Sequence, residues 1–277
     1  MADDHIVDIL IAERAPKIAA APWWPLVRPM LYALLGYKTA RYMADEVAKR
    51  SGAEAMLWTS NLLGLKLEVI GAENIARTGR LVAVSNHPTG ITDGLAMYDT
   101  ITPIRPDAIF FANADALRVN PRFAEVVIPV EWVESKRTRE KTRETLNRAK
   151  EALEQERLVV VFPAGRLAQR QEDGSLSDPP WATSAVSLAR KYEAPIVPIH
   201  MAGPWSTLFH FFGGFSQELR DITLFHEMLN KKGKTYRLTI GAAIPPDRLG
   251  VDGSGTTLAL KHFVERELAT DPKAVFR

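Results

Sequence analysis

Residues 81–94 read LVAVSNHPTGITDG. The run LVAV at 81–84 is apolar throughout, which is typical of a buried strand, and it ends at a polar turn that contains His87. A helix is expected at 94–101, directly after Asp93. Strand, turn and helix in this order form the repeating unit of α/β sheets. The stretch therefore indicates the fold class, and it places a base and a carboxylate at an exposed strand end.

Strand and helix patterns continue to alternate along the rest of the chain. Further strands are expected at 65–70, 108–112, 126–130, 158–162, 195–199 and 236–241, and further helices at 135–155, 183–191 and 257–268. We predict an α/β fold with a largely parallel central sheet flanked by helices. Residues 6–61 contain helical patterns and no strand candidate, and the run 37–63 has few helix breakers. The chain thus divides into an N-terminal helical segment, 1–62, and an α/β domain, 63–277.

The composition is that of an ordinary globular protein. The 277 residues are 46% hydrophobic and 25% charged, and 35 basic and 33 acidic residues give a net charge of +2. The small excess of basic residues argues against a nucleic-acid partner. The absence of cysteine excludes disulfides and thiolate nucleophiles. The first residues, MADDH, do not resemble a signal peptide, so we expect the protein on the cytoplasmic side of the membrane.

Two aromatic stretches raise the question of a membrane surface. Residues 21–37 contain Arg28 and three prolines and are short for a membrane span. Trp23 and Trp24, followed by MLYALL at 30–35, are instead typical of an interfacial helix, although such aromatics also close a core from outside. The first interpretation predicts a peripheral protein at the inner face of the membrane. The stretch WSTLFHFFGGF at 205–215 fits an acyl-chain groove, a membrane-facing edge or a core-packing helix.

The pair His87 and Asp93 has two interpretations. A neutral imidazole can take a proton from a hydroxyl group, and a carboxylate on its other nitrogen fixes the tautomer and stabilises the imidazolium. Alternatively, Asp93 and Thr92 only cap the helix that follows, while residues 86–88 form a polar turn. On spacing alone, a helix cap is the commoner arrangement.

Two later motifs change that balance. The strand at 158–162 ends in FPAGR at 162–166, and the strand at 195–199 begins within APIVP at 194–198. In this order and spacing, the three motifs resemble those of the glycerophospholipid acyltransferase superfamily, which includes the 1-acylglycerol-3-phosphate acyltransferases. The segment 218–241 resembles the bacterial branch labelled hemolysin-like. The resemblance covers about residues 65–246.

The resemblance implies a reaction and a set of site residues. It implies transfer of a fatty acyl group from an acyl thioester to a hydroxyl of a lysophospholipid or related lipid, in phospholipid biosynthesis. Acyl-CoA or acyl carrier protein would be the donor substrate, with no cofactor. His87 would be the general base, oriented by Asp93, without a covalent acyl-enzyme. Amides near Gly90 or in the Gly165 turn would stabilise the oxyanion. The substrate-binding candidates are Asn86, Gly90, Arg137, Phe162, Pro163, Gly165 and Arg166.

The two arginines are chosen because an anionic acceptor favours a guanidinium group, which binds phosphate in a bidentate manner. The superfamily places a basic residue near the site after the strand at 126–130, where Lys136, Arg137 and Arg139 lie. Arg137 and Arg166 are favoured because each follows a strand end.

The chain departs from the superfamily pattern at two places. Four residues usually separate the His and the Asp, whereas five, 88–92, separate His87 and Asp93, and Gly90 could let the loop absorb the extra residue. Ala164 replaces the usual Glu of the third motif, which removes a carboxylate that binds the acceptor. The acceptor could therefore be a hydroxyl compound other than a glycerolipid, for example an amino-acid-containing lipid or a polyketide-like hydroxyl compound. A non-catalytic lipid-binding protein on the same fold is the other alternative, but it would not need the dyad.

Two further enzyme classes are weakly supported. The sequence has no Gly-x-Ser-x-Gly nucleophile elbow of a hydrolase. Its six histidines are dispersed, without the spacing of a metal site, so no metal is predicted. We interpret His200, at the end of the strand 195–199, as structural.

Overall fold

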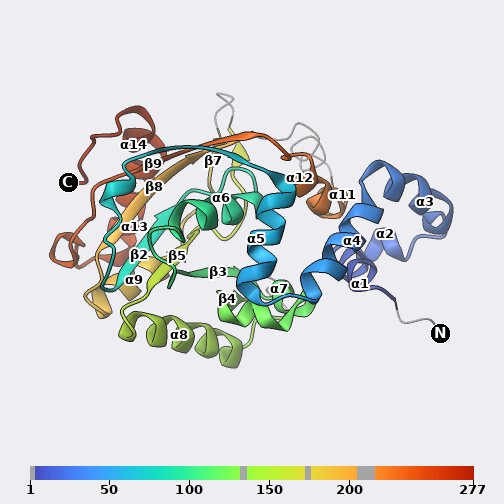
Figure 1. Cartoon of the computed structure of the whole chain (residues 1–277), viewed down its shortest axis with the longest axis horizontal. Helices are drawn as coiled ribbons and strands as arrows, with labels where there is room; N and C mark the ends of the chain where they lie inside the picture. The colour runs from blue at the N-terminus through green and yellow to red at the C-terminus, as the bar shows by residue number, and fades with distance from the viewer. Residues whose placement is uncertain (1–3, 132–135, 172–175, 205–215) are drawn as a thin grey trace.

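The computed structural model describes residues 4–131, 136–171, 176–204 and 216–277 (Figure 1). Its centre is a seven-stranded sheet with the order β1-β9-β8-β2-β5-β3-β4. The strands are β1 (Lys66–Ile70), β2 (Leu81–Ser85), β3 (Ile109–Asn113), β4 (Val127–Val130), β5 (Leu158–Val161), β8 (Ile196–Ala202) and β9 (Thr235–Ile240). Every neighbouring pair is parallel except β8 and β9. The prediction of a largely parallel α/β sheet is thus confirmed.

Helices cover both faces of the sheet. Val82 and Val84 of β2 pack on the face covered by α8 (Arg139–Glu154), α9 (Ser184–Lys191) and the C-terminal helices, whereas Leu81 and Ala83 pack on the face covered by α6 (Ile91–Ile101). Because successive side chains of a strand point to opposite faces, a strand buried on both sides must be apolar at every position. Complete burial of a valine side chain contributes roughly 1.5–3 kcal/mol. This requirement explains the unbroken LVAV run.

The order of the strands brings two motifs together. Although β3 follows β2 in the sequence, β5 lies between these two strands in the sheet. β2 and β5 are therefore neighbours, with Val84 opposite Val161. Both strands run in the same direction, and their carboxyl ends therefore lie at one edge of the sheet. Ligands of open α/β sheets bind at such an edge, where the direction of chain progression changes.

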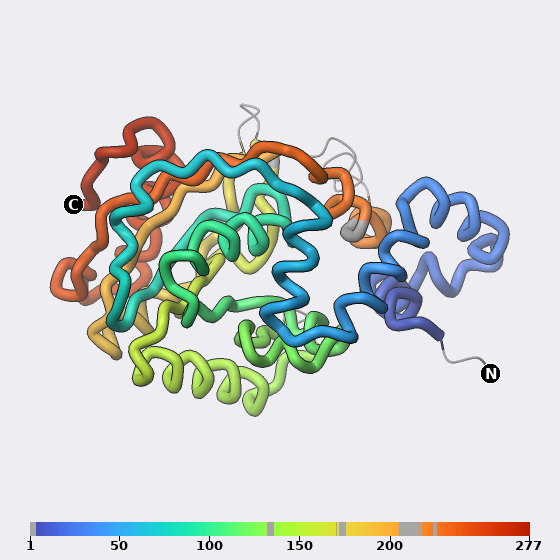
Figure 2. Tube along the Cα trace, viewed as in Figure 1, coloured from blue at the N-terminus to red at the C-terminus, as the bar shows by residue number. Residues whose placement is uncertain are grey.

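The N-terminal segment is helical, as predicted, and α1–α4 form a lobe at one end of the molecule (Figures 1 and 2). Its helices are α1 (Ile6–Arg14), α2 (Pro16–Ala19), α3 (Trp24–Leu34), α4 (Tyr37–Ala48) and α5 (Gly52–Leu63). The run 37–63, which has few helix breakers, is divided into α4 and α5. The Ser51 hydroxyl accepts from the N–H of Glu54, and the Glu54 carboxylate accepts from Ser51 N–H at 2.8 Å, so a capping box starts a new helix.

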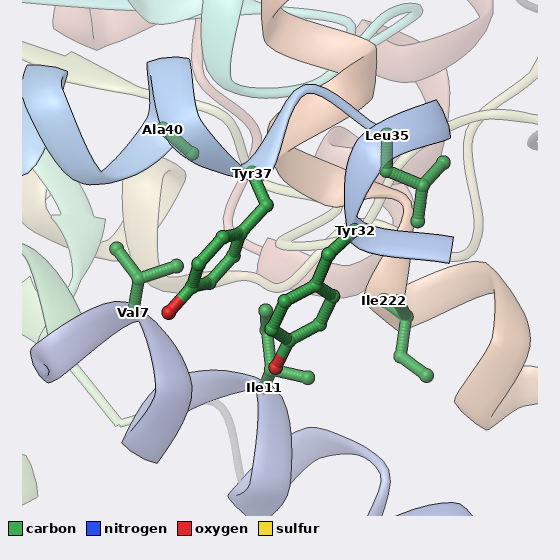
Figure 3. Close-up of a pocket in the computed structure, with 7 residues that line it drawn as sticks. All are labelled: Val7, Ile11, Tyr32, Leu35, Tyr37, Ala40 and Ile222. Atoms are coloured by element: carbon green, nitrogen blue, oxygen red, sulfur yellow. The ribbon is translucent and has the colours of Figure 1, made fainter. Parts of the chain in front are cut away.

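The lobe has its own small core. A cavity of about 10 Å³ lies between α1, α3, α4 and α11 (Gln217–Ile222), and its lining residues are Val7, Ile11, Tyr32, Leu35, Tyr37, Ala40 and Ile222 (Figure 3). The rings of Tyr32 and Tyr37 stack with centroids 3.9 Å apart, and both hydroxyls donate to Asp8. The cavity has room for no more than one water molecule and contains no predicted site residue. A separate cluster formed by Met43, Leu63, Leu95 and Met228 joins the lobe to the α/β part.

Several element boundaries differ from the expectations, and the strand expected at 195–199 is β8 (Ile196–Ala202). The helix expected at 94–101 begins earlier, at Ile91, and the charged helix begins at Arg139. The closing helix, expected at 257–268, starts as α13 (Gly253–His262), contains a π-helical turn, η5 (Phe263–Glu267), and ends as α14 (Leu268–Thr270). The aromatic stretch 205–215 lies outside the described residues. Among the described residues, no helix combines the length and the apolar character that crossing a membrane requires.

Candidate active site

The loop after β2 requires a glycine. Gly90 has φ of +105° and ψ of −138°, a conformation that other residues rarely adopt, and it immediately precedes α6. Asp93 lies in the first turn of α6, where its N–H donates to Gly90 O at 2.9 Å and its carboxylate accepts from Gly90 N–H at 3.0 Å. Asp93 therefore does cap the helix, as one of the two interpretations predicts.

The same carboxylate also reaches His87. His87 Nδ1 lies 2.8 Å from Asp93 Oδ2, so the five intervening residues do not keep the two side chains apart. The Asp93 side chain is fully buried, and it accepts from Thr89 N–H at 2.8 Å and from the Thr89 hydroxyl. An oxygen that already accepts two backbone N–H groups accepts from the ring as well, which fixes the proton on Nδ1. The Nε2 lone pair is then left to accept a proton.

A chain of buried hydroxyl groups, those of Thr89, Tyr236 and Thr92, leads to the carboxylate of Asp93. Tyr236 in β9 is completely buried, and its hydroxyl lies 2.8 Å from the Thr89 hydroxyl and 2.7 Å from that of Thr92. Burial raises the pKa of Tyr236 to about 12, so the phenol keeps its proton. Since Thr89 donates to Asp93, its oxygen is free to accept from Tyr236, which in turn can accept from Thr92. The sequence offers no local signal for Tyr236, which is distant in the chain.

The neighbouring strand end covers the ring of His87. The Phe162 ring, just after β5, stacks on the His87 ring with centroids 4.6 Å apart. The segment after it runs beside the His87 loop, because Ala168 N–H donates to His87 O at 2.9 Å. Arg166 lies two residues earlier and is exposed. The His87 side chain keeps 18% of its surface exposed, so solutes can reach it.

Several predicted binding residues have structural contacts. Asn86 Nδ2 donates to Met201 O at 2.9 Å and its Oδ1 accepts from Met201 N–H at 2.7 Å, which ties β2 to β8. Pro163 is buried, and its carbonyl accepts from Ala182 N–H. Both polar atoms of the Asn86 amide thus have a backbone partner, and a substrate contact of Asn86 stays a prediction.

Among the amides expected to bind the oxyanion, those of the two glycines themselves have partners in the protein. Gly90 N–H donates to Asp93, and Gly165 N–H donates to Phe162 O at 3.0 Å within its own turn, where Gly165 has φ of +61°. Two other amides of that turn, those of Ala164 and Arg166, make no hydrogen bond to the described part of the chain. They are the donors that sequence reasoning did not single out individually.

Arg137 lies farther along the sheet edge. It follows β4 and is exposed, with its Nε donating to Glu131 O at 3.3 Å. Since β5 and β3 lie between β4 and β2, strand spacing puts the two strand ends about 14 Å apart. Of the two predicted arginines, Arg166 therefore lies in the segment that contacts the His87 loop, and a substrate role stays a prediction for both.

His200 has the structural contact that we expected. Its Nδ1 lies 3.0 Å from the Val264 carbonyl in η5, and burial holds the pKa of its ring below the ordinary value. Within the described ranges of the chain, no group of histidines and carboxylates is arranged to hold a metal ion. A residue that the sequence analysis missed is Asp178, whose buried carboxylate accepts from the backbone N–H of His87.

Comparisons with known proteins agree with the geometry. The family model described as Acyltransferase matches residues 66–202. A lyso-glycine lipid O-acyltransferase from Phocaeicola vulgatus is 28% identical over 189 residues, covering 66% of this chain and 66% of that protein. One from Bacteroides thetaiotaomicron is 23% identical over 256 residues, covering 88% and 91%. The crystal structure of the 1-acyl-sn-glycerophosphate (LPA) acyltransferase PlsC from Thermotoga maritima shares the fold, with a TM-score of 0.50, 16% identity and 96% coverage of both chains.

Proposed function

Because the chain belongs to the glycerophospholipid acyltransferase superfamily, we propose that it moves a fatty acyl group from an acyl thioester to a hydroxyl group of a lysolipid. The donor is acyl-CoA or acyl carrier protein. The observation that carries the proposal is the hydrogen bond between His87 and Asp93 at the carboxyl end of β2. A protein that only binds lipids has no use for a base oriented in this way.

The proposed reaction is direct transfer. His87 Nε2 takes the proton of the acceptor hydroxyl as its oxygen attacks the thioester carbonyl carbon. The tetrahedral intermediate then expels the thiolate, which receives the proton from His87, and the products are an ester and a free thiol. Asp93 holds the ring in the required tautomer and stabilises the imidazolium that forms between the two steps. No acyl-enzyme is required.

The oxyanion needs hydrogen-bond donors close to the dyad. The amides of Ala164 and Arg166 belong to the turn that follows Phe162, which stacks on His87, and neither donates to a described protein group. We assign the oxyanion to these two amides. Backbone donors that are fixed before the reaction stabilise a developing negative charge without reorganisation.

The acceptor is proposed to be a lysolipid with an anionic head group. Arg166 is exposed, in the segment whose Ala168 N–H donates to His87 O, and its guanidinium suits either a phosphate or a carboxylate. Two relatives carry the name lyso-glycine lipid O-acyltransferase, and Ala164 stands where the superfamily usually has a Glu. These observations favour an amino-acid-containing lysolipid as the second candidate beside a lysophospholipid.

We also propose that α3 lies on a membrane surface, at its inner face. Trp24 does not belong to that surface, because it is 7% exposed and packs against Tyr32 in the lobe. The outward face instead presents Trp23, Leu26, Met30 and Leu34, which are 48%, 83%, 70% and 71% exposed. Their spacing forms one apolar stripe along the helix, which is typical of a helix that lies at an interface.

The test is an acyl-transfer assay with purified protein. Acyl-CoA and acyl carrier protein donors are combined with lysophospholipids and lyso-glycine lipid, and His87→Ala and Asp93→Asn are compared with wild type. We expect His87→Ala to lose nearly all turnover and Asp93→Asn most of it. His262→Ala, a change of an exposed histidine in α13, is the matched control and should retain activity. Full turnover by His87→Ala would overturn the mechanism, and lipid binding without turnover by wild type would favour a binding protein.

A further inference from the structure

A second buried carboxylate lies behind His87. Asp178 follows β7 (Leu176–Ser177) and is 5% exposed. Both of its oxygens lie 3.1 Å from the backbone nitrogen of His87, and the indole N–H of Trp181 donates to Oδ2 at 2.9 Å. His87 therefore contacts two carboxylates: Asp93 through its ring and Asp178 through its main chain.

Asp178 is itself held by the C-terminal helices. Its N–H donates to Glu265 Oε1 at 2.7 Å, and the Ser177 hydroxyl donates to Glu265 Oε2 at 2.9 Å. Glu265 lies in the π-helical turn η5 and pairs with Lys261 at 2.7 Å. Single π-helical turns within helices are rare and frequently occur at functional sites. Here the turn is the element that carries Glu265, so it fixes the segment from which Asp178 reaches the His87 loop.

An ionised carboxylate at the buried position 178 is energetically unfavourable. Burial raises the pKa of Asp178 to about 6, although the hydrogen bonds from Trp181 and His87 oppose the shift. The side chain of an asparagine or a serine would accept from the same N–H group without the cost of a buried charge. A hydrogen bond to an ionised acceptor is, however, about twice as strong as one to a neutral acceptor. The ionised Asp178 thus makes a strong hydrogen bond to the main chain of His87, the residue whose orientation the proposed reaction requires.

We infer that Asp178 is a positioning residue: its ionised carboxylate holds the main chain of His87 and thereby keeps the imidazole on Asp93. The inference rests on the proposed function, because it assigns a role in acyl transfer. Protonation of Asp178 converts one acceptor oxygen into a donor and weakens its hold on His87. The charged or titratable groups around it are His87 on the loop after β2, Glu265 in η5, Lys261 in α13 behind Glu265, and His200 in β8 on the Val264 carbonyl.

The first test compares kcat at two pH values for Asp178→Asn, which keeps an acceptor oxygen but no charge. We expect kcat to fall about tenfold at pH 8 with an unchanged KM, and to approach the wild-type value at pH 5, where wild-type Asp178 is itself protonated. Asp178→Ala, which leaves the His87 N–H without an acceptor, should be impaired at both pH values. Asp99→Asn is the matched control, because Asp99 is also a carboxyl whose pKa burial raises, but it bonds to Ser60. Its ratio to wild type should not change with pH.

The second test uses the wild-type protein and needs no activity. With ¹⁵N-histidine labelling, the backbone amide signal of His87 is identified by its absence from His87→Ala and is followed from pH 8 to pH 5. We expect the pH dependence of the signal to include a component with a midpoint near the pKa of Asp178, about 6, that is absent from Asp178→Asn. An amide that titrates identically in both proteins, or a kcat ratio independent of pH, overturns the inference. Absence of acyl transfer by wild type would instead refute the proposed function, and the amide titration would still decide the contact.

Discussion

The buried charge of Asp178 predicts that Asp178→Asn becomes more stable relative to wild type as the pH rises. The pKa of this carboxyl rises from 3.8 to about 6 on folding. Between these values the folded protein binds more protons than the unfolded chain, so the free energy of unfolding falls with increasing pH. The shift of about two pKa units, at about 1.36 kcal/mol each, makes the ionised group cost the fold about 3 kcal/mol above pH 6. Asparagine does not titrate and removes this dependence.

The difference between variant and wild type isolates this one group. At pH 5, one unit below the pKa, protonation restores about 1.4 kcal/mol to wild type, so the variant should gain about 1.4 kcal/mol relative to wild type between pH 5 and pH 8. Urea unfolding followed by circular dichroism gives both free energies. The control is Asp107→Asn, because the hydrogen bond from Arg105 holds the pKa of Asp107 below its ordinary value, and its difference from wild type should stay constant over this range. A constant or falling difference for Asp178→Asn would refute the reasoning.

Three further predictions concern the dyad, its loop and α3. Tyr236→Phe should lower kcat about tenfold with little change in KM, because it interrupts the chain of hydroxyl groups that leads to Asp93. Steady-state kinetics measures both constants, and an unchanged kcat would contradict the role of Tyr236 in supporting Asp93. Gly90→Ala should destabilise the protein by about 1–3 kcal/mol in thermal unfolding, because φ is +105° and the new Cβ would meet Leu167. The control is Gly94→Ala, within α6 and with open space around it, which should not destabilise the protein. Equal effects of the two changes would contradict the role of Gly90. The double variant Leu26→Gln, Met30→Gln should bind anionic phospholipid vesicles at least about tenfold more weakly in co-sedimentation, and unchanged binding would exclude α3 from the membrane surface.

The sequence predicts those parts of the site, strand β2 and the loop from His87 to Asp93, whose structure depends on residues close together in the chain. The LVAV run gives a strand buried on both faces, and the following loop needs only a few residues to return Asp93 to His87. The two interpretations of Asp93, as a helix cap and as the partner of His87, are both correct. A carboxylate in the first turn of a helix that starts directly after the loop can accept from the loop amides and from the ring together. Spacing alone could not show this, because it depends on where α6 begins.

The residues that were missed are those whose partners lie far along the chain. Tyr236 and Asp178 reach the dyad only because β9 and the segment after β7 return to it in the folded sheet. The contact of Asn86 with Met201 in a neighbouring strand could not be predicted for the same reason. The error on Trp24 has a different cause. Adjacent residues of a helix point about 100° apart, so Trp23 and Trp24 cannot both belong to one narrow apolar face. The helical period alone could have shown this.

The position of Asp178 also bears on how the proposed reaction is accelerated. In the resting enzyme this carboxylate is ionised at neutral pH in a buried place, where its charge is unfavourable. When His87 accepts the proton of the acceptor, a positive charge forms on the ring that contacts Asp93, in the residue whose backbone N–H donates to Asp178. A positive His87 favours the ionised form of Asp178. Both carboxylates therefore interact more favourably with the transition state than with the resting state, and only such a difference increases kcat. A neutral residue at 178 would hold the same N–H group less strongly and would also lack this second effect, which gives the buried charge a use in the proposed reaction.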